Sequence, residues 1–149
     1  MSEYKSDLVN TLVERGYHFQ STNLDGLDEA AKAGIVTGYI GFDATATSLH
    51  VGSLVQIMML RRMQQAGHKP IILMGGGTTK IGDPSGRDKT RSMLTHDQIQ
   101  ANKASILTAF NALVKIGDGP TDALVVDNDD WLSQYGYLEF LRLFGQHFT

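Results

Sequence analysis

Three short apolar segments alternate with longer segments of helical periodicity, and this alternation limits the fold more than any other feature. The apolar segments, at residues 36–42, 71–74 and 124–126, are rich in β-branched, aromatic and aliphatic side chains, as strands are. A strand–helix–strand–helix–strand–helix order predicts a parallel sheet with right-handed crossovers. The fold class expected is therefore α/β, a Rossmann-like doubly wound parallel sheet of which this chain holds only the first half.

The expected helices follow from apolar spacing and from capping residues. One spans residues 52–66, with a predicted apolar face of Val55, Met58, Met59, Met63 and Ala66. A second starts at the capping-box pair Thr95 and Gln98 and runs to about residue 116. The last spans residues 137–144, and two short helices precede the first strand, near residues 8–13 and at 25–33. A half-fold of this kind is expected to leave a sheet edge and apolar helix faces poorly covered.

Composition excludes several classes of function. A chain of 149 residues suits one domain with a core, and 42% hydrophobic and 19% charged residues are ordinary for a soluble protein. The absence of cysteine excludes disulfides and thiolate metal sites, and fits a cytoplasmic location without separating it from a cysteine-free periplasmic one. The first residues show no signal peptide, and no apolar run is long enough to span a bilayer. The net charge of −3 provides no overall attraction to RNA.

The stretch from residue 39 to residue 53 joins the first expected strand to the helix that follows it. A helix start presents free backbone N–H groups and the positive end of the helix dipole, which suits a phosphate. His50 adds a hydrogen-bond donor there, and Gly52 lets a ligand approach the backbone closely. This connection is therefore predicted to bind a phosphate group.

A second glycine-rich loop is predicted after the second strand. Glycines crowd residues 75–78 and 82–86, and basic side chains follow at Arg87, Lys89 and Arg91. Two such loops and a basic cluster, each after a strand, indicate a nucleotide as ligand, because such folds bind at the carboxyl ends of their strands. The acidic residues Asp127, Asp129 and Asp130 are better explained by a turn and a helix cap than by a metal, so no metal site is predicted.

The segment His50-Val51-Gly52-Ser53 resembles the His-Ile-Gly-His signature of class I aminoacyl-tRNA synthetases, and residues 75–86 resemble the tyrosyl branch. The similarity covers essentially the whole chain, which is identified as the amino-terminal part of a tyrosyl-tRNA synthetase catalytic domain. The implied division is an amino-terminal helical segment, 1–34, and the first half of a Rossmann-type catalytic domain, 35–149. Later parts of the family pattern would lie beyond Thr149, so the chain is expected to be a fragment.

The resemblance implies a reaction and its participants. The family activates L-tyrosine with ATP to form tyrosyl-adenylate and then transfers the tyrosyl group to tRNA(Tyr). ATP with Mg²⁺ is therefore expected as a substrate, with no resident metal or organic cofactor. The expected partners are L-tyrosine, ATP and tRNA(Tyr), the expected location is the cytoplasm, and the full-length protein is expected to be a homodimer.

The resemblance also implies roles for residues around ATP. His50, Thr45 and the basic residues Arg87 and Arg91 are expected to stabilise charge in the transition state, with Ser53 standing where the family has a second histidine. A serine hydroxyl still donates a hydrogen bond, but it is shorter and never cationic. The residues expected to bind ATP or the adenylate are Gly41, Asp43, Thr45, His50 and Gly52. Read without the resemblance, Asp43 and Thr45 are turn formers, and His50 is a helix cap.

A second set of residues is expected to bind tyrosine by resemblance. The phenol of Tyr39 would pair with the substrate phenol, and Asp83 would meet the substrate ammonium group. The remaining members of the expected tyrosine pocket are Asp43, Leu73, Asn128 and Trp131. Without the resemblance, Tyr39 is a half-buried strand residue, Leu73 and Trp131 belong to the core, and Asp83 and Asn128 form turns.

Two other functions stay open from the sequence. A different nucleotidylyl transferase of the same superfamily, or a tryptophanyl synthetase, would also carry a histidine at a helix start. A non-catalytic nucleotide- or amino-acid-binding fragment would keep the motif without the activity, and Ser53 favours it. Tyrosine-dependent adenylate formation separates these alternatives from a tyrosine–tRNA ligase.

Overall fold

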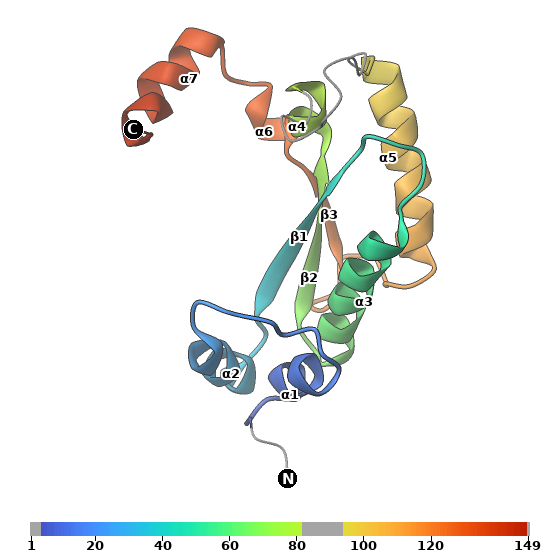
Figure 1. Ribbon diagram of the computed structural model, residues 1–149, viewed down its shortest axis with the longest axis vertical. Helices are drawn as coiled ribbons and strands as arrows, with labels where there is room; N and C mark the ends of the chain where they lie inside the picture. Colours follow the sequence, from blue (N-terminus) through green and yellow to red (C-terminus); the bar gives the residue numbers. More distant parts are fainter. Residues whose placement is uncertain (1–3, 82–93, 149) are drawn as a thin grey trace.

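A parallel three-stranded sheet forms the centre of the computed structural model, which describes residues 4–81 and 94–148 (Figure 1). The strands β1 (Thr37–Asp43), β2 (Lys69–Gly75) and β3 (Leu124–Asp127) lie in the order β1-β2-β3. The register pairs Gly41 with Leu73 and Leu73 with Val126. The predicted parallel sheet, with one strand at each expected segment, is confirmed.

The helices follow the strands in the predicted alternation. The expected helices correspond to α1 (Asp7–Glu14), α2 (Leu24–Ala33), α3 (Val51–Gln65), α5 (His96–Asn111) and α7 (Tyr137–Phe144). Three shorter elements were not expected as such: α4 (Gly76–Ile81), α6 (Asp129–Leu132) and the 3₁₀ turn η1 (Gly145–His147). The capping box at the start of α5 is confirmed, since Thr95 accepts from the Gln98 backbone and Gln98 accepts from the Thr95 backbone.

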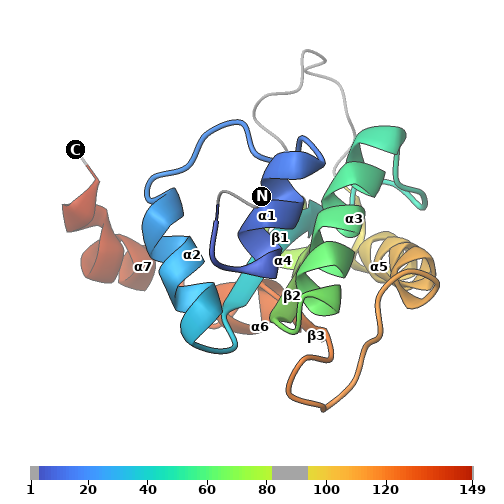
Figure 2. The same ribbon diagram turned by 90° about the horizontal axis from the view of Figure 1, so that it is seen from below.

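One face of the sheet carries the core, and we call it the covered face. It consists of Gly38, Ile40 and Phe42 from β1 together with Pro70, Ile72 and Met74 from β2. Helices α3 and α5 lie on this side (Figures 1 and 2), and they contribute Ile57, Leu60, Ile106 and Phe110 to the same cluster. The rings of Phe42 and Phe110 meet edge to face at 4.8 Å, which joins β1 to α5.

The opposite, open face carries the alternating residues Tyr39, Gly41 and Asp43 of β1 and Ile71, Leu73 and Gly75 of β2. The Tyr39 side chain is 69% exposed, and Leu124 on β3 is 41% exposed. Ile71 and Leu73 are only partly buried, so the expectation that β2 is buried on both faces is wrong. The reason is that α3 and α5 pack on the other side.

Helix α7 lies on the opposite side of the molecule from α3 and α5 in both views (Figures 1 and 2). It begins and ends where the sequence predicts, yet Tyr137 and Leu138 are 77% and 78% exposed. The expectation of uncovered apolar surface is therefore confirmed on both α7 and the open face. In residues 4–81 and 94–148, no helix is long and apolar enough to cross a membrane.

Three details of the predicted helices are wrong. The buried side chains of α3 are Ser53, Ile57 and Leu60, whereas Val55 is 55% exposed. Helix α5 ends at Asn111 rather than near residue 116, because Lys115 and Ile116 pair with the strand segment near Ala123 instead. The expected glycine-rich loop at residues 75–78 is the end of β2 and the first turn of α4.

Candidate active site

The first helix start at the predicted site is closed by its own histidine. His50 is the N-cap of α3, and its Nδ1 accepts a hydrogen bond of 3.1 Å from the Gly52 backbone N–H. An accepting Nδ1 carries no proton, so the neutral ring has its proton on Nε2. The residue is exposed, and that Nε2–H is available to donate a hydrogen bond. The interpretation of His50 as a cap and its interpretation as a ligand donor are therefore compatible.

Gly52 leaves room for that cap. A Cβ at this position would lie 2.9 Å from Cε1 and 3.0 Å from Nδ1 of His50. Contacts that short would make the imidazole shift, so the glycine favours the capping position of the ring. Ser53, which directly follows Gly52, is 7% exposed and shares the core-facing side of α3 with Ile57.

The second helix start is closed by side chains from the end of β3. Asp127 Oδ1 accepts a 3.0 Å hydrogen bond from the Gly76 N–H, and Asn128 Oδ1 accepts from Gly77 N–H at 2.8 Å and Thr78 N–H at 3.4 Å. These are the free donors of α4. The glycines at 75–78 are predicted to be part of a second loop of the nucleotide site, but here the backbone donors of a helix start face a carboxylate and an amide.

Two ion pairs lie at the two ends of α4, one through Asp127 at its start and one through Lys80 at its end. Asp127 is paired with Lys103 of α5, and both side chains are about 15% exposed or less. Asp129 accepts two hydrogen bonds of 2.6 Å from Lys80 Nζ at the end of α4. Hydrogen bonds from Lys80 and Ser133 lower the pKa of the Asp129 carboxyl. The acidic cluster is thus explained by caps and ion pairs, and the described parts of the chain show no group of three or more potential metal ligands.

A chain of hydrogen bonds connects the ends of β1 and β3. The Thr78 hydroxyl lies 3.3 Å from Asp43 Oδ1, and it accepts a 3.2 Å hydrogen bond from Asn128 Nδ2. Asn128 is buried, whereas Asp43 is exposed. The structure therefore brings Asp43 and Asn128, two of the predicted site residues, to either side of Thr78.

Four predicted site residues share the open face of the sheet. Tyr39, Gly41 and Asp43 alternate along β1, and Leu73 is the register partner of Gly41. A Cβ built on Gly41 would meet no atom within 4 Å, so the surface above this backbone is free. The structure thus presents a phenol, a bare backbone segment and a carboxylate in one line.

The connection between β1 and α3 is anchored through Ala44, a residue that sequence reasoning missed. The Ala44 N–H donates to Thr79 Oγ1 at 3.1 Å, and the Ala44 carbonyl accepts from Asn102 Nδ2 at 2.8 Å. Ala44 is fully buried, and both partners are 6% exposed. No local pattern marks Thr79 or Asn102, because each acts on a residue 35 or 58 positions away.

Two further predicted site residues, Thr45 and Trp131, are exposed. Thr45 directly follows Ala44, and Trp131 lies on α6 with 44% exposure. Asp83, Arg87 and Arg91 lie outside the described residues.

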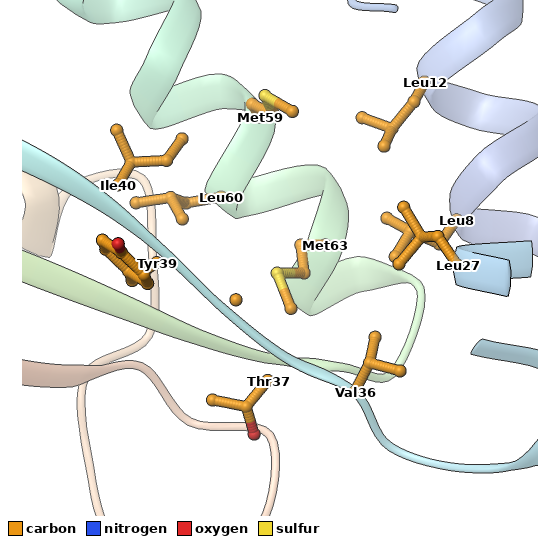
Figure 3. A pocket seen from close by; sticks show the side chains of 11 residues that line it. Leu8, Leu12, Leu27, Val36, Thr37, Tyr39, Ile40, Met59, Leu60 and Met63 are labelled. Atoms are coloured by element: carbon orange, nitrogen blue, oxygen red, sulfur yellow. The ribbon is translucent and has the colours of Figure 1, made fainter. Parts of the chain in front are cut away.

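An apolar pocket lies away from these residues. It has a volume of about 170 Å³ and is lined by α1, α2, α3 and the first half of β1, with side chains including Leu8, Leu12, Leu27 and Met63 (Figure 3). Of the predicted site residues it touches only Tyr39. An apolar lining without charged groups does not suit a nucleotide, so we assign the candidate site to the carboxyl ends of the strands and the open face.

A Rossmann-like half-sheet with a histidine at the first helix start matches the class of protein found by comparison. The family model of tRNA synthetases class I (W and Y) matches residues 32–149, and the chain belongs to this family.

Similar curated proteins include several named tyrosine–tRNA ligase. The chain is 62% identical over 148 residues to the tyrosine–tRNA ligase of Caulobacter vibrioides, with 99% of this chain and 35% of the relative covered. It is 60% identical over 149 residues to that of Novosphingobium aromaticivorans, covering 100% of this chain and 36% of the relative. The chain thus spans about a third of the length of these relatives.

Solved structures agree with this assignment. A C-terminally truncated mitochondrial tyrosyl-tRNA synthetase from Aspergillus nidulans matches with a TM-score of 0.77 and 28% identity, over 97% of this chain and 44% of that one. The corresponding enzyme from Coccidioides posadasii matches with a TM-score of 0.72 and 27% identity, over 97% and 41%. The predicted family and fold class are confirmed.

Proposed function

We propose that this chain supplies the first half of the catalytic domain of a tyrosine–tRNA ligase, which activates L-tyrosine with ATP and transfers it to tRNA(Tyr). The names of the similar proteins support the reaction. The observation that carries the proposal is His50, whose Nδ1 is used by the helix cap and whose Nε2–H is left to donate. This donor stands at the start of α3, where the helix dipole also favours negative charge.

The proposed first step needs no nucleophile from the protein. A tyrosine carboxylate oxygen attacks the α-phosphorus of ATP, and the bond from that phosphorus to the bridging oxygen breaks. Pyrophosphate leaves with the electron pair, and tyrosyl-adenylate remains bound. A ribose hydroxyl at the 3′ end of tRNA later attacks the tyrosyl carbonyl carbon and loses its proton, the bond from that carbon to the phosphate oxygen breaks, and AMP leaves. Positioning and charge stabilisation provide the catalysis in such a step.

The residues divide along β1 in this proposal. Tyr39 binds the phenol of the substrate beside Leu73, the bare backbone at Gly41 lies under the adenylate, and Asp43 binds near the amino acid. His50, Gly52 and Thr45 bind phosphate groups, with Ser53 buried behind them. Trp131 and Asn128 back the tyrosine pocket, Asp83 binds the substrate ammonium, and Arg87 and Arg91 stabilise pyrophosphate.

The proposed partners follow from the reaction. Mg²⁺ arrives with ATP as part of the substrate and neutralises phosphate charge. The reaction takes place in the cytoplasm, where tRNA and ATP meet, and the complete protein acts as a homodimer.

ATP–pyrophosphate exchange tests the proposed function directly. We would measure it on the 149-residue chain and on a chimera in which this chain replaces the matched 148 residues of the Caulobacter vibrioides ligase. Tyrosine, tryptophan, phenylalanine or no amino acid is added. Exchange by the chimera that requires tyrosine is the expected result.

Other outcomes identify the competing functions. Exchange with tryptophan instead of tyrosine would assign the chain to the other branch of the family. A folded chimera without exchange would contradict the proposal and favour a non-catalytic binding fragment. Exchange by the chimera alone, and not by the 149-residue chain, would show that the chemistry needs the second part of the relative.

A further inference from the structure

Two buried polar side chains from different helices both bind the backbone of one residue, Ala44. Thr79 of α4 accepts from its N–H at 3.1 Å, and Asn102 of α5 donates to its carbonyl at 2.8 Å. All three residues are at least 94% buried. The Ala44 N–H belongs to the peptide group that joins Asp43 to Ala44, and its carbonyl belongs to the one that joins Ala44 to Thr45. The two hydrogen bonds therefore hold the peptide groups on both sides of Ala44.

Ala44 separates two exposed residues of the proposed site. Asp43 ends β1 on the open face, and Thr45 begins the connection to α3. Both side chains are exposed, and the two peptide groups that flank Ala44 set the backbone positions of both residues. The Ala44 methyl group is fully buried, which leaves this segment no room to shift without opening the packing.

We infer that Thr79 and Asn102 are positioning residues of the adenylation site, which set the geometry of Asp43 and Thr45 by clamping Ala44. This inference rests on the proposed function. Neither side chain reaches the substrate; each acts through the Ala44 backbone, and the two helices that carry them are linked to β1 through it.

Helix α4 also contacts Asp43, the residue before Ala44. Thr79 follows Thr78, whose hydroxyl lies 3.3 Å from Asp43 Oδ1. Neighbouring residues of α4 thus contact the side chain of Asp43 and the backbone of Ala44. A shift of α4 would therefore move the contact with Asp43 and the contact with Ala44 together.

The test compares near-isosteric variants in the chimera with the Caulobacter vibrioides ligase. Thr79→Val and Asn102→Leu remove the hydrogen bonds and keep most of the volume, while Thr79→Ser keeps the hydroxyl. Misplaced site residues are expected to lower kcat of tyrosine-dependent exchange about tenfold with KM for tyrosine changed less than about threefold. Thr79→Ser is expected to keep activity within about twofold of the unmodified chimera, since its hydroxyl still accepts.

A matched control separates positioning from stability. Asn10 in α1 donates to the carbonyls of Tyr4 and Ser6 at 2.9 and 3.0 Å, far along the chain from the site. Asn10→Leu is expected to lower the thermal midpoint as the other variants do and to leave kcat unchanged. If Asn102→Leu does not fold, the Thr79 pair alone decides.

The outcomes are distinguishable. An active chimera whose Thr79→Val and Asn102→Leu variants keep the unmodified kcat would overturn this inference and leave the proposed function standing. Equal losses of kcat in Asn10→Leu would also overturn it, because they would be effects of stability. A folded, inactive chimera would contradict the proposed function itself, and this inference with it.

Discussion

The starts of α3 and α4 both follow a strand of the same sheet and both contain glycine, yet they are closed in different ways. His50 caps α3 from the residue next to the helix, and its ring stays exposed. The start of α4 is capped by Asp127 and Asn128, which come from the end of β3 about fifty residues away. At the start of α3, the Nε2–H of His50 remains to donate to a ligand. At the start of α4, the backbone N–H groups donate to side chains of the protein.

The glycines of the two helices have correspondingly different causes. Gly52 leaves room for the His50 ring, and Gly76 leaves room for a carboxylate, since a Cβ there would lie 2.4 Å from Asp127 Oδ1. Glycine after a strand is thus as consistent with a close protein cap as with a bound phosphate. Only the partners of the backbone N–H groups distinguish the two.

The largest expected effect concerns His50 at the start of α3. His50→Asn keeps a side-chain oxygen that caps the helix but removes the Nε2–H donor. We expect tyrosine-dependent exchange by the chimera to fall about 100-fold, as for loss of one preorganised donor. The unfolding free energy should change by less than about 0.5 kcal/mol. Full exchange activity in His50→Asn would show that His50 is a cap and nothing more.

The next effect concerns the closed side. Asp127→Ala removes the caps of Gly76 and Asp129 and leaves the mostly buried ammonium of Lys103 without its partner. We expect a loss of about 3 kcal/mol in urea unfolding, typical of breaking a buried pair. The control Asp118→Ala removes an exposed carboxylate and should cost less than about 0.5 kcal/mol. Equal costs for the two variants would mean that Asp127 does not hold α4.

A smaller change separates hydrogen bonding from charge at the same helix start. Asn128→Ala removes the acceptor for Gly77 and Thr78 and should cost about 1 kcal/mol, as loss of an N-cap does. Asn128→Asp keeps an acceptor whose negative charge the helix start favours but loses the Nδ2 donor to Thr78, so it should cost less than Asn128→Ala without being neutral. Thermal and urea unfolding of both variants give the comparison; a more stable alanine variant would contradict it.

The smallest effect is a dependence of stability on pH. The pKa of Asp129 is lowered below 3.8 in the folded protein by its hydrogen bonds with Lys80 and Ser133. As pH falls through the ordinary value, the unfolded chain takes up the proton first, so this stabilisation is present above it and is lost on acidification. Asp129→Asn should therefore flatten the fall of the urea midpoint below about pH 4. An unchanged slope would show that the ion pair contributes nothing measurable.

Elements with a local cause were predictable from the sequence. The α7 bounds agree with its apolar spacing, and the Thr95–Gln98 capping box lies within four residues. The strands were found because apolar runs between helical patterns leave few other topologies. The residues of the open face follow from period-two alternation once the sheet is known.

The errors have long-range causes. Helix α4 depends on Asp127 and Asn128, and no window around residue 76 contains them. The buried face of α3 is chosen by contact with β1, β2 and α5 rather than by its own apolar residues, which is why Ser53 lies inside and Val55 outside. Thr79 and Asn102 went unnoticed for the same reason, because their partner Ala44 is marked by nothing but its position.

The regular spacing of residues along β1 sets the distance between Tyr39 and Asp43. Alternate residues on one face are about 6.6 Å apart along a strand, so Tyr39 and Asp43 stand about 13 Å from each other, with the bare backbone of Gly41 between them. Deleting one residue between them would turn one of the two to the covered face rather than shorten the interval. The separation of the Tyr39 and Asp43 side chains on the open face can therefore change only in steps of two residues. This separation sets the length of a ligand that contacts both side chains.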